Sequence, residues 1–307
     1  MANNQQQNQN NNGSKQTGYP DSNFFINIPK QHQTTHPGLE TDMNPKPIFD
    51  HPLYNKQSGR LQDKVAIITG GDSGIGRAVS LAYAKDGAKV VIVYYNEDQD
   101  ANDTKAAIEQ AGSQCHLIKG DISDENFCNT VIQETVTTFG GLNILVNNSA
   151  VQFPKNSLTE ITSEQLNRTF AVNIFSMFYL SKAALPHLSA GDSIINTSSI
   201  TAYQGHETLL DYSATKGAIT TFTRSLSKSL APKAIRVNSV APGPIWTPLI
   251  PSSFDPQKTS QFGSSTPLGR PGQPVELGAA YVFLASDDAS YITGQTIHIN
   301  GGEVING

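Results

Sequence analysis

Short apolar runs alternate with amphipathic stretches along most of the chain, and this alternation constrains the fold more than any other feature. Helical stretches such as 74–86 and 101–111 lie between apolar runs that we interpret as buried strands, at residues 65–68, 89–95, 114–119, 143–146, 193–197 and 235–240. Short apolar strands that alternate with helices are typical of a parallel sheet covered on both faces. Right-handed crossovers then make the sheet doubly wound. The sequence therefore predicts an α/β domain over residues 61–307.

The first 60 residues have a different character. Residues 3–12 are only Asn and Gln, which cannot bury enough apolar surface to offset the entropy of ordering, so we expect residues 1–23 to be a disordered tail. A self-associating, prion-like segment is the alternative, which the shortness of the run disfavours. Residues 24–60 mix apolar side chains with prolines, and proline prevents long helices. We expect an extended arm that lies on the domain or on a neighbouring subunit.

Composition excludes several classes of protein. A length of 307 residues suggests two domains at about 150 residues each, but no second apolar pattern restarts after residue 150, so we favour one domain. A net charge of −5 gives no support to a nucleic-acid-binding protein. Cys115 and Cys128 make neither a disulfide framework nor a metal site. No apolar run approaches the roughly 18 residues of a membrane span, and the N-terminus lacks a secretory signal. We therefore expect a cytoplasmic protein.

A glycine-rich turn between the first strand and its helix is the first functional signal. Gly70, Gly74 and Gly76 permit a tight turn, close approach of a phosphate and close packing of helix on strand. The N-terminus of the helix offers N–H groups and a positive dipole end to a pyrophosphate. A glycine-rich turn can also be a plain connector, but the position after a strand and before a helix favours a dinucleotide site.

Two later segments bear on the nucleotide. An acidic residue at the end of the second strand would bind a ribose 2′-hydroxyl, and an arginine would suit a 2′-phosphate. Tyr94 and Tyr95 stand there instead; Asn96 or Glu97 could reach a ribose, and no arginine follows. This favours NAD over NADP. Asp121, after the third strand, is suited to accept from the adenine amino group, or else it serves the start of the next helix.

Tyr212 and Lys216 are the second signal. Residues four apart lie on one helical face, so the phenol and the ammonium can share a pocket. A nearby lysine favours phenolate and lowers the pKa of the phenol from its reference value near 10. Tyr212 could then act as general base for an alcohol or general acid for a carbonyl. Taken alone, such a pair is usually an exposed pair or a packed tyrosine.

Hydroxyl groups that end the fifth strand favour the catalytic interpretation. The strand 193–197 leads into Ser198 and Ser199, and the carboxyl ends of parallel strands form the ligand crevice. Alternation along the strand would point the two hydroxyls in opposite directions. Ser199 could stabilise an oxyanion or the substrate oxygen.

With these motifs the sequence resembles the short-chain dehydrogenase/reductase family over residues 60–307. Thr69–Gly76 fits the family's TGxxxGxG loop, and Asn147–Ala150 takes the place of NNAG. Asn173, Ser199, Tyr212 and Lys216 match the four catalytic positions, and Asn238 with Pro242–Gly243 matches NxxxPG. The resemblance implies a Rossmann-type domain with a seven-stranded parallel sheet, strand order 3-2-1-4-5-6-7, and a homotetramer.

The resemblance also implies a set of cofactor contacts. Thr247 falls where the family binds the nicotinamide carboxamide, and Lys216 where it binds the ribose. The whole set for NAD or NADP is Gly70, Ser73, Gly74, Ile75, Gly76, Tyr94, Asp121, Ile122, Asn148, Ser149, Tyr212, Lys216, Pro242, Gly243, Ile245 and Thr247.

Three departures from the common pattern are informative. Ala150 replaces a glycine and adds a methyl group beside the cofactor, and Asn300 in the C-terminal 293–302 segment replaces an aspartate. The missing charge at Tyr94 leaves the choice of nucleotide open. The segment Pro37–Pro47 resembles an N-terminally extended subgroup of bacterial general-stress oxidoreductases and plant glucose/ribitol dehydrogenase homologues.

The expected reaction is hydride transfer between a nicotinamide and a carbonyl or secondary alcohol. Tyr212 moves the proton on oxygen and Ser199 polarises that oxygen; by resemblance, Asn173 holds a water in a locally irregular helix.

The flap 246–269 would govern substrate choice. Small aldehydes, ketones, sugars and polyols all remain open. The apolar residues of the flap either form a lid over the substrate or pack in the core. They are Trp246, Leu249, Ile250, Phe254 and Phe262. Candidates for the polar side of the pocket are Gln152, Gln204, His206 (more often a surface histidine) and Glu207, and we assign Ser199, Gln152, Gln204 and Trp246 to the substrate.

Two alternative functions were weighed. A nucleotide-binding regulatory or structural protein could keep this fold without turnover. The complete set of Ser199, Tyr212 and Lys216 argues against that, because such a protein needs none of them. Enoyl reductases of the wider family use a longer spacing between tyrosine and lysine, which disfavours that activity.

Overall fold

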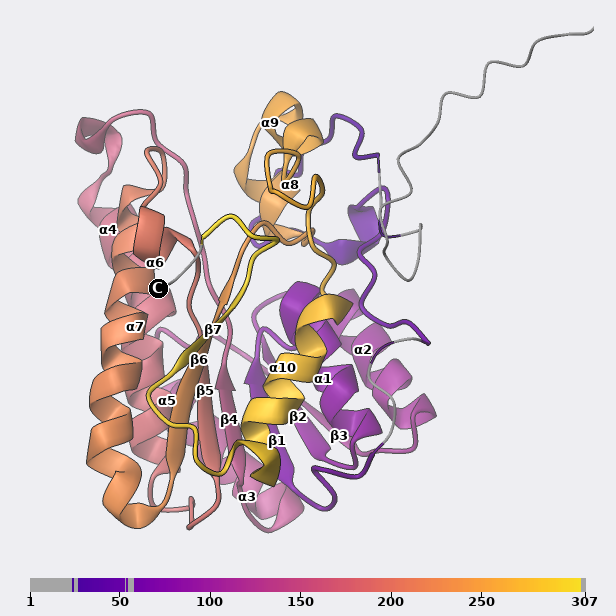
Figure 1. The fold of residues 1–307 in the computed structure, drawn as a ribbon, viewed down its shortest axis with the longest axis vertical. Coiled ribbons are helices and arrows are strands. Elements are labelled where there is room, and N and C mark those ends of the chain that lie inside the picture. The colour runs from indigo at the N-terminus through magenta and orange to yellow at the C-terminus, as the bar shows by residue number, and fades with distance from the viewer. Residues whose placement is uncertain (1–23, 25–26, 53, 55–57, 305–307) are drawn as a thin grey trace, which may run out of the picture.

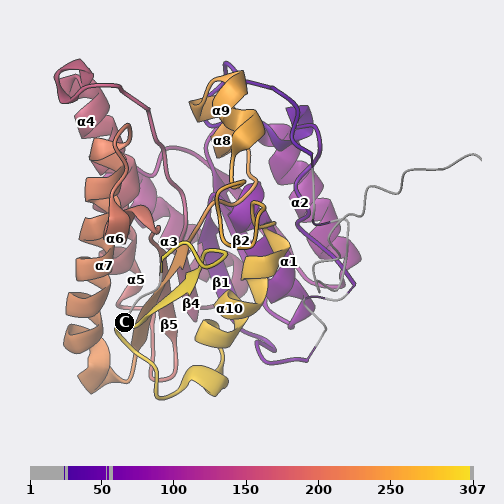
Figure 2. The same ribbon diagram turned by 45° about the horizontal axis from the view of Figure 1, so that its top comes forward.

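The computed structural model describes residues 24, 27–52, 54 and 58–304. Within them, parallel strands form one seven-stranded sheet in the order β3-β2-β1-β4-β5-β6-β7 (Figures 1 and 2), which confirms the predicted topology. The strands are β1 (Val65–Thr69), β2 (Lys89–Tyr94), β3 (Cys115–Lys119), β4 (Ile144–Asn147), β5 (Ser193–Thr197), β6 (Arg236–Pro242) and β7 (Thr296–Ile299). The predicted strand that ended at residue 240 extends to Pro242.

Helices cover both faces of the sheet (Figure 1). One face carries α1 (Gly74–Lys85), α2 (Asp98–Gln110) and α10 (Val275–Ala285). The other carries α3 (Glu125–Phe139), α5 (Ser176–Ala184) and α7 (Leu210–Leu230). Near the carboxyl ends of the strands lie four shorter helices, α4 (Ser163–Phe170), α6 (Thr201–Gln204), α8 (Leu249–Ser253) and α9 (Pro256–Gln261).

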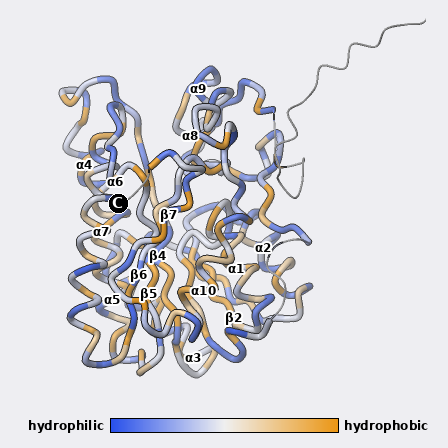
Figure 3. The backbone as a smooth tube through the Cα atoms, in the orientation of Figure 1, coloured by the Kyte–Doolittle hydropathy of each residue, from blue (hydrophilic) through white to orange (hydrophobic). Residues whose placement is uncertain are grey.

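The two faces are built from alternate residues of the same strands. In β1, Ala66 and Ile68 pack in the cluster under α1 and α10, whereas Ile67 packs in the cluster under α3 and α5. β4 divides in the same way, with Leu145 on the second face. Because side chains alternate across a strand, a strand buried on both faces must be apolar throughout. Figure 3 shows the resulting hydrophobic centre, with polar segments outside it.

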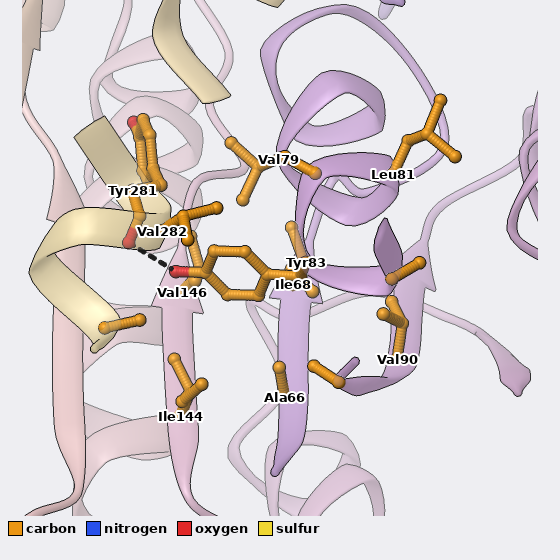
Figure 4. Close-up of a cluster of buried hydrophobic side chains, with 14 of the residues drawn as sticks. Ala66, Ile68, Val79, Leu81, Tyr83, Val90, Ile144, Val146, Tyr281 and Val282 are labelled. Carbon is orange, nitrogen blue, oxygen red and sulfur yellow. Dashed lines mark hydrogen bonds between the residues drawn. The ribbon is translucent and has the colours of Figure 1, made fainter. Parts of the chain in front are cut away.

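A tyrosine ties α1 to α10 above the sheet. Tyr83 is fully buried, and its hydroxyl donates to the backbone carbonyl of Tyr281 at 3.1 Å (Figure 4). The ring packs among Ile68, Val146 and Val282 (Figure 4). This contact joins two helices whose sequence positions lie almost 200 residues apart.

We expect Tyr83→Phe to lower the free energy of unfolding by about 1 kcal/mol, because it removes one buried hydrogen bond and keeps the ring. Tyr83→Ala should cost about 3–5 kcal/mol, because it leaves a cavity. Urea denaturation followed by circular dichroism measures both values. Equal destabilisation by the two substitutions would contradict this division of roles.

An N-terminal arm, residues 27–52, runs along the domain with a single 3₁₀ turn at Glu40–Asp42. Figure 1 shows it in indigo beside α8, α9 and α1. The indole of Trp246 donates to the Pro45 carbonyl at 2.9 Å, and the Val275 N–H donates to Ile48. The arm thus contacts this chain's own domain, one of the two placements expected.

The predicted disordered tail, residues 1–23, lies outside the described residues. In the part of the chain that the structure describes, no helix combines the length and apolarity needed to cross a membrane.

Candidate active site

A cavity of about 510 Å³ opens at the carboxyl ends of the strands. Its walls come from the glycine loop after β1, the segments after β2, β4 and β5, helix α7, and residues 242–265. This is the crevice where open α/β sheets bind ligands, and its volume is in the range of small-molecule sites.

The glycine loop has the geometry that its sequence predicts. Gly70 and Gly74 have φ of +60° and +51°, a region that favours glycine. A Cβ on Gly76 would lie 1.8 Å from the Gly70 carbonyl oxygen, so only glycine lets α1 approach the loop this closely. Gly70, Gly74 and Ile75 line the cavity, whereas Gly76 acts in packing.

This loop fits a dinucleotide pyrophosphate. Within the described residues, the backbone N–H groups of Ile75 and Gly76 at the start of α1 have no hydrogen-bond partner in the chain. Ser73, just before them, also lines the cavity. Free N–H groups at a helix N-terminus are the donors that phosphate oxygens accept from.

The end of β4 is fixed to the end of β1 beside the loop. The Thr69 hydroxyl accepts from the backbone N–H groups of Asn148 at 2.9 Å and Ser149 at 3.0 Å. The Asn148 amide donates to the Thr69 carbonyl at 3.1 Å. These contacts hold Asn148, Ser149 and Ala150 in the cavity wall.

Gly76→Ala should therefore weaken dinucleotide binding at least tenfold, because the added methyl group must push α1 away from Gly70. Gly141→Ala is the matched control, since nothing lies within 4 Å of the Cβ it would add and its φ is not positive. Fluorescence titration with NADH and NADPH measures the dissociation constants. Unchanged affinity in a folded Gly76→Ala protein would contradict the assigned role of this loop.

Two buried carboxyl groups, one from the loop after β1 and one from the segment after β2, line the cavity. Asp72 and Glu97 line it together with Tyr94 and Tyr95. Burial, and then the neighbouring Glu97, raise the pKa of Asp72 to about 7. Burial also raises the pKa of Glu97, whose Oε1 has no partner in the described chain. Asp72 lies inside the glycine motif, yet spacing alone did not single it out.

Asp121 and Ile122 also line the cavity, as predicted. The Asp121 carboxylate is already engaged, since it accepts from Ser123 at 2.9 Å and from the Arg168 guanidinium at 2.6 Å. Helix α3 is capped by Asp124 instead of Asp121. Arg168, which sequence reasoning missed, lines the cavity beside Tyr95.

Helix α7 brings Tyr212 and Lys216 to the same wall. It begins at Leu210, slightly earlier than the sequence indicated. Lys216 is 1 % exposed, and its Nζ donates to the Thr197 carbonyl at 2.8 Å and lies 5.3 Å from the centroid of the Tyr212 ring. Both side chains line the cavity.

The expected lowering of the Tyr212 pKa is wrong for the protein alone. Burial raises the pKa of Tyr212 to about 12, and a hydrogen bond with Ser199 opposes this. Burial lowers the pKa of Lys216 to about 7. Desolvation disfavours the charged form of either group, and it is the main cause of both shifts.

The hydroxyls of Ser198 and Ser199 have different partners, although both residues line the cavity. The Ser198 hydroxyl donates to the Lys216 carbonyl at 3.1 Å and is buried against α7. The Ser199 hydroxyl accepts from the Thr201 N–H at 3.1 Å, lines the cavity and bonds to Tyr212. The structure thus brings Ser199, Tyr212 and Lys216 together.

Asn173 lies behind this wall. Residues Ala171–Phe175 form a π-helical segment, the local irregularity expected here. The Asn173 side chain accepts from the Val151 N–H at 2.8 Å and donates to the Val151 carbonyl at 2.9 Å and the Thr215 hydroxyl at 3.1 Å. It therefore fixes the backbone next to Gln152 and does not line the cavity.

The proposed flap contains α8 and α9. Four of its predicted apolar residues line the cavity: Leu249, Ile250, Phe254 and Phe262. Trp246 does not, because it is fully buried and bonded to the arm. Thr247, Pro242, Gly243 and Ile245 lie in the wall, as do the polar candidates Gln152, Gln204, His206 and Glu207.

Two wall residues, Pro37 and Gly38, belong to the N-terminal arm. Sequence reasoning missed them, because nothing local shows that a segment before the domain reaches the cavity. The segment Pro37–Pro47, noted only as a subgroup marker, was the available signal.

Comparison with known proteins decides the family. The family model described as Enoyl-(Acyl carrier protein) reductase matches residues 70–303. The chain belongs to the short-chain dehydrogenase/reductase family. It is 61 % identical to the Uncharacterized oxidoreductase YhxC of Bacillus subtilis (91 % of this chain, 97 % of that protein) and 55 % identical to General stress protein 39 of the same organism (92 % and 99 %). It is 48 % identical to Glucose and ribitol dehydrogenase of Daucus carota (91 % and 98 %).

Relatives in this short-chain dehydrogenase/reductase family use either nicotinamide cofactor. The NADPH-dependent aldehyde reductase 1, chloroplastic, of Arabidopsis thaliana is 47 % identical (90 % of this chain, 98 % of that protein). A Burkholderia cenocepacia short chain dehydrogenase in complex with NADP superposes with a TM-score of 0.75 at 31 % identity (80 % and 99 % covered). A 3-ketoacyl-(acyl-carrier-protein) reductase from Brucella melitensis complexed with NADH gives 0.72 at 32 % (80 % and 100 %). The chain is thus an NAD(P)-dependent oxidoreductase.

Proposed function

We propose that this chain interconverts a small polar aldehyde or ketone with its alcohol, with Tyr212 as the acid and base. The observation that carries the proposal is the meeting of Ser199, Tyr212 and Lys216 in one cavity with the glycine loop. When bound, the nicotinamide supplies the hydride to the carbonyl carbon or accepts it from the alcohol carbon. Side chains of this chain carry out the proton transfer and position the substrate oxygen.

In reduction, the Tyr212 hydroxyl donates its proton to the carbonyl oxygen as the C–H bond forms. A pKa of about 12 keeps this phenol protonated and ready to donate. In oxidation the phenolate takes the proton from the alcohol, and the adjacent Lys216 Nζ stabilises that phenolate. Ser199 donates to the same substrate oxygen and holds it near Tyr212.

Tyr212→Phe should abolish turnover, by at least a thousandfold in kcat, and leave the dissociation constant for dinucleotide within about threefold. Tyr203→Phe is the matched control, because the Tyr203 hydroxyl has no partner in the described chain and lies outside the cavity wall. Stopped-flow or steady-state oxidation of NADH and NADPH over a panel of aldehydes, ketones, sugars and polyols measures turnover.

Retention of a large part of the activity in Tyr212→Phe would overturn the role of Tyr212. Dinucleotide binding without turnover of any substrate in the panel would favour the nucleotide-binding regulatory or structural alternative.

The cavity wall supports a substrate with hydroxyl groups. Gln152 is 4 % exposed, and its side-chain amide has no hydrogen-bond partner in the described chain although it lines the cavity. Gln204 adds a second amide, and Ile250 and Phe254 form an apolar side. Amides bind hydroxyls without demanding a charge, which suits a sugar, a polyol or a short hydroxyaldehyde. The name of the carrot relative includes a sugar and a polyol, glucose and ribitol, and that of the Arabidopsis relative includes an aldehyde. Enoyl reduction is not proposed, given the spacing of Tyr212 and Lys216.

We further propose that NAD(H) is preferred to NADP(H). The buried carboxyls of Asp72, in the glycine loop after β1, and of Glu97, after β2, both line the cavity, and a 2′-phosphate beside them would bring further negative charge. The nearby Arg168 is engaged with Asp121. The net effect of these groups opposes a phosphate and suits hydroxyls.

Wild-type protein should therefore show a kcat/KM for NADH at least tenfold above that for NADPH. The double variant Asp72→Asn, Glu97→Gln should reduce this ratio several-fold, because both carboxyls become neutral amides. Asp103→Asn, which removes a charge from helix α2 outside the cavity wall, should leave the ratio unchanged. A wild-type preference for NADPH would refute the proposal.

Assembly and location complete the proposal. Phe175 and Phe178 are about half exposed, and the Phe178 ring packs on Phe222 with centroids 4.2 Å apart. This apolar face across α5 and α7 fits a second copy of the chain, in line with the expected homotetramer. The cytoplasmic location stays a prediction from the sequence.

A further inference from the structure

Three segments far apart in the sequence meet at Gly74. The first is the glycine loop itself. The second is the start of the flap, since a Cβ on Gly74 would lie 3.1 Å from the Thr247 side chain. The third is the N-terminal arm, where the Glu40 carboxylate accepts from the Gly74 N–H at 2.8 Å. The family's catalytic residues account for neither the arm nor its carboxylate.

Glu40 is held firmly at this junction. It is 2 % exposed, and its Oε1 pairs with the Arg77 guanidinium at 2.9 Å. Its backbone N–H donates to the Asp100 carboxylate at 2.7 Å, and so connects the arm to α2 as well. Arg77 is clamped from the other side by Phe49, whose ring centroid lies 3.8 Å from the guanidinium carbon.

The first N–H groups of α1 differ in whether they have an acceptor within the chain. Glu40 takes the Gly74 N–H, while the N–H groups of Ile75 and Gly76 keep no partner in the described chain. Arg77 pairs with the Glu40 carboxylate and so offsets its negative charge beside the glycine loop. Glu40 thus anchors one amide of the first turn and leaves the following two for the phosphates.

The same arm is attached to the flap. The Gln33 N–H donates to the Pro251 carbonyl at 2.8 Å, and His32 Nδ1 lies 2.8 Å from the Phe254 carbonyl oxygen. A Cβ on Gly38 would lie 2.6 Å from the Pro248 carbonyl oxygen, so arm and flap are in close contact in the cavity wall. The apolar cluster beneath joins both to the catalytic tyrosine: Ile28, Met43, Leu209, Tyr212, Trp246, Ile250 and Phe254.

We propose that Glu40 is a positioning residue for the cofactor, which fixes the pyrophosphate loop at Gly74 and connects it through the arm to the substrate flap. The arm is then part of the active site. The part of this proposal that concerns the glycine loop requires only that the chain binds a dinucleotide. The part that concerns the substrate flap rests on the function proposed above.

The test compares Glu40→Ala, Glu40→Gln and Asp42→Asn. Glu40→Ala removes the acceptor for Gly74 and the partner of Arg77, and Glu40→Gln keeps an acceptor but loses the charge. Asp42→Asn removes the same charge two residues away, from an exposed side chain. Isothermal titration with NADH and NADPH, without substrate, gives the dissociation constants, and thermal unfolding of each protein alone gives its stability.

We expect Glu40→Ala to raise the dissociation constant about tenfold, which corresponds to about 1.4 kcal/mol. Glu40→Gln should raise it about threefold, and Asp42→Asn should leave it unchanged. Because the titration needs no turnover, this result stands even if the proposed substrates fail. Wild-type affinity in folded Glu40→Gln and Glu40→Ala, with only the unfolding temperature lowered, would show a merely structural role and overturn the proposal.

Gly38→Ala tests the connection to the flap and does not touch Glu40. The added methyl group should push the arm away from Pro248. We expect this displacement to raise the KM for the carbonyl substrate several-fold and to weaken dinucleotide binding. Gly141→Ala is again the control. If Glu40→Ala does not fold, Glu40→Gln and Gly38→Ala decide the question. No change in either constant for Gly38→Ala would overturn the proposed connection.

Discussion

The approach of helix α1 to the end of strand β1 governs the rest of the site. With only hydrogen at Gly76, the helix comes so close to Gly70 that no other residue fits. That contact fixes where the first helical N–H groups lie, and every neighbour is placed relative to them. Asn148 packs against the same spot, Thr247 lies against Gly74, and Glu40 accepts the Gly74 N–H. One tight contact thus sets the positions of segments from the whole length of the chain.

Desolvation is the second constraint. The site gathers ionisable groups into a cavity where burial disfavours charge, so the pKa of Tyr212 rises and that of Lys216 falls. At the other end, burial raises the pKa values of Asp72 and Glu97. A positively charged nicotinamide at one end would favour phenolate, whereas a 2′-phosphate at the other would meet carboxyl groups. Burial therefore makes the two ends of the cavity sensitive to the charge of what binds there.

The sequence predicted the parallel sheet and the glycine loop, because these depend on local patterns, whereas the strand order was implied by the family resemblance. Alternating apolar strands and helices admit few topologies, and a glycine triplet at a strand–helix turn has few uses. The irregular helix around Asn173, which the family resemblance implied, is also confirmed.

What the sequence did not reveal depends on distant contacts. Trp246 was assigned to the substrate, but it packs behind the wall and bonds to Pro45. The pKa of Tyr212 was judged from the nearby lysine alone, whereas burial, which only the fold reveals, dominates it. Pro37 and Gly38 reach the cavity because the arm packs against residues that lie more than 200 positions later in the sequence. No local sequence pattern predicts such a contact.

The arm also has a consequence for how the chain folds during synthesis. Its anchor at His32 is separated from Phe254 by 222 positions. The arm is synthesised before the domain, yet its docking surface exists only after Phe254 has been made. Contacts of such long sequence separation form late, since the loop must close before they contribute. Ile28 and Met43 therefore stay exposed on the nascent chain until the flap has been synthesised, and transiently exposed apolar side chains of this kind favour aggregation.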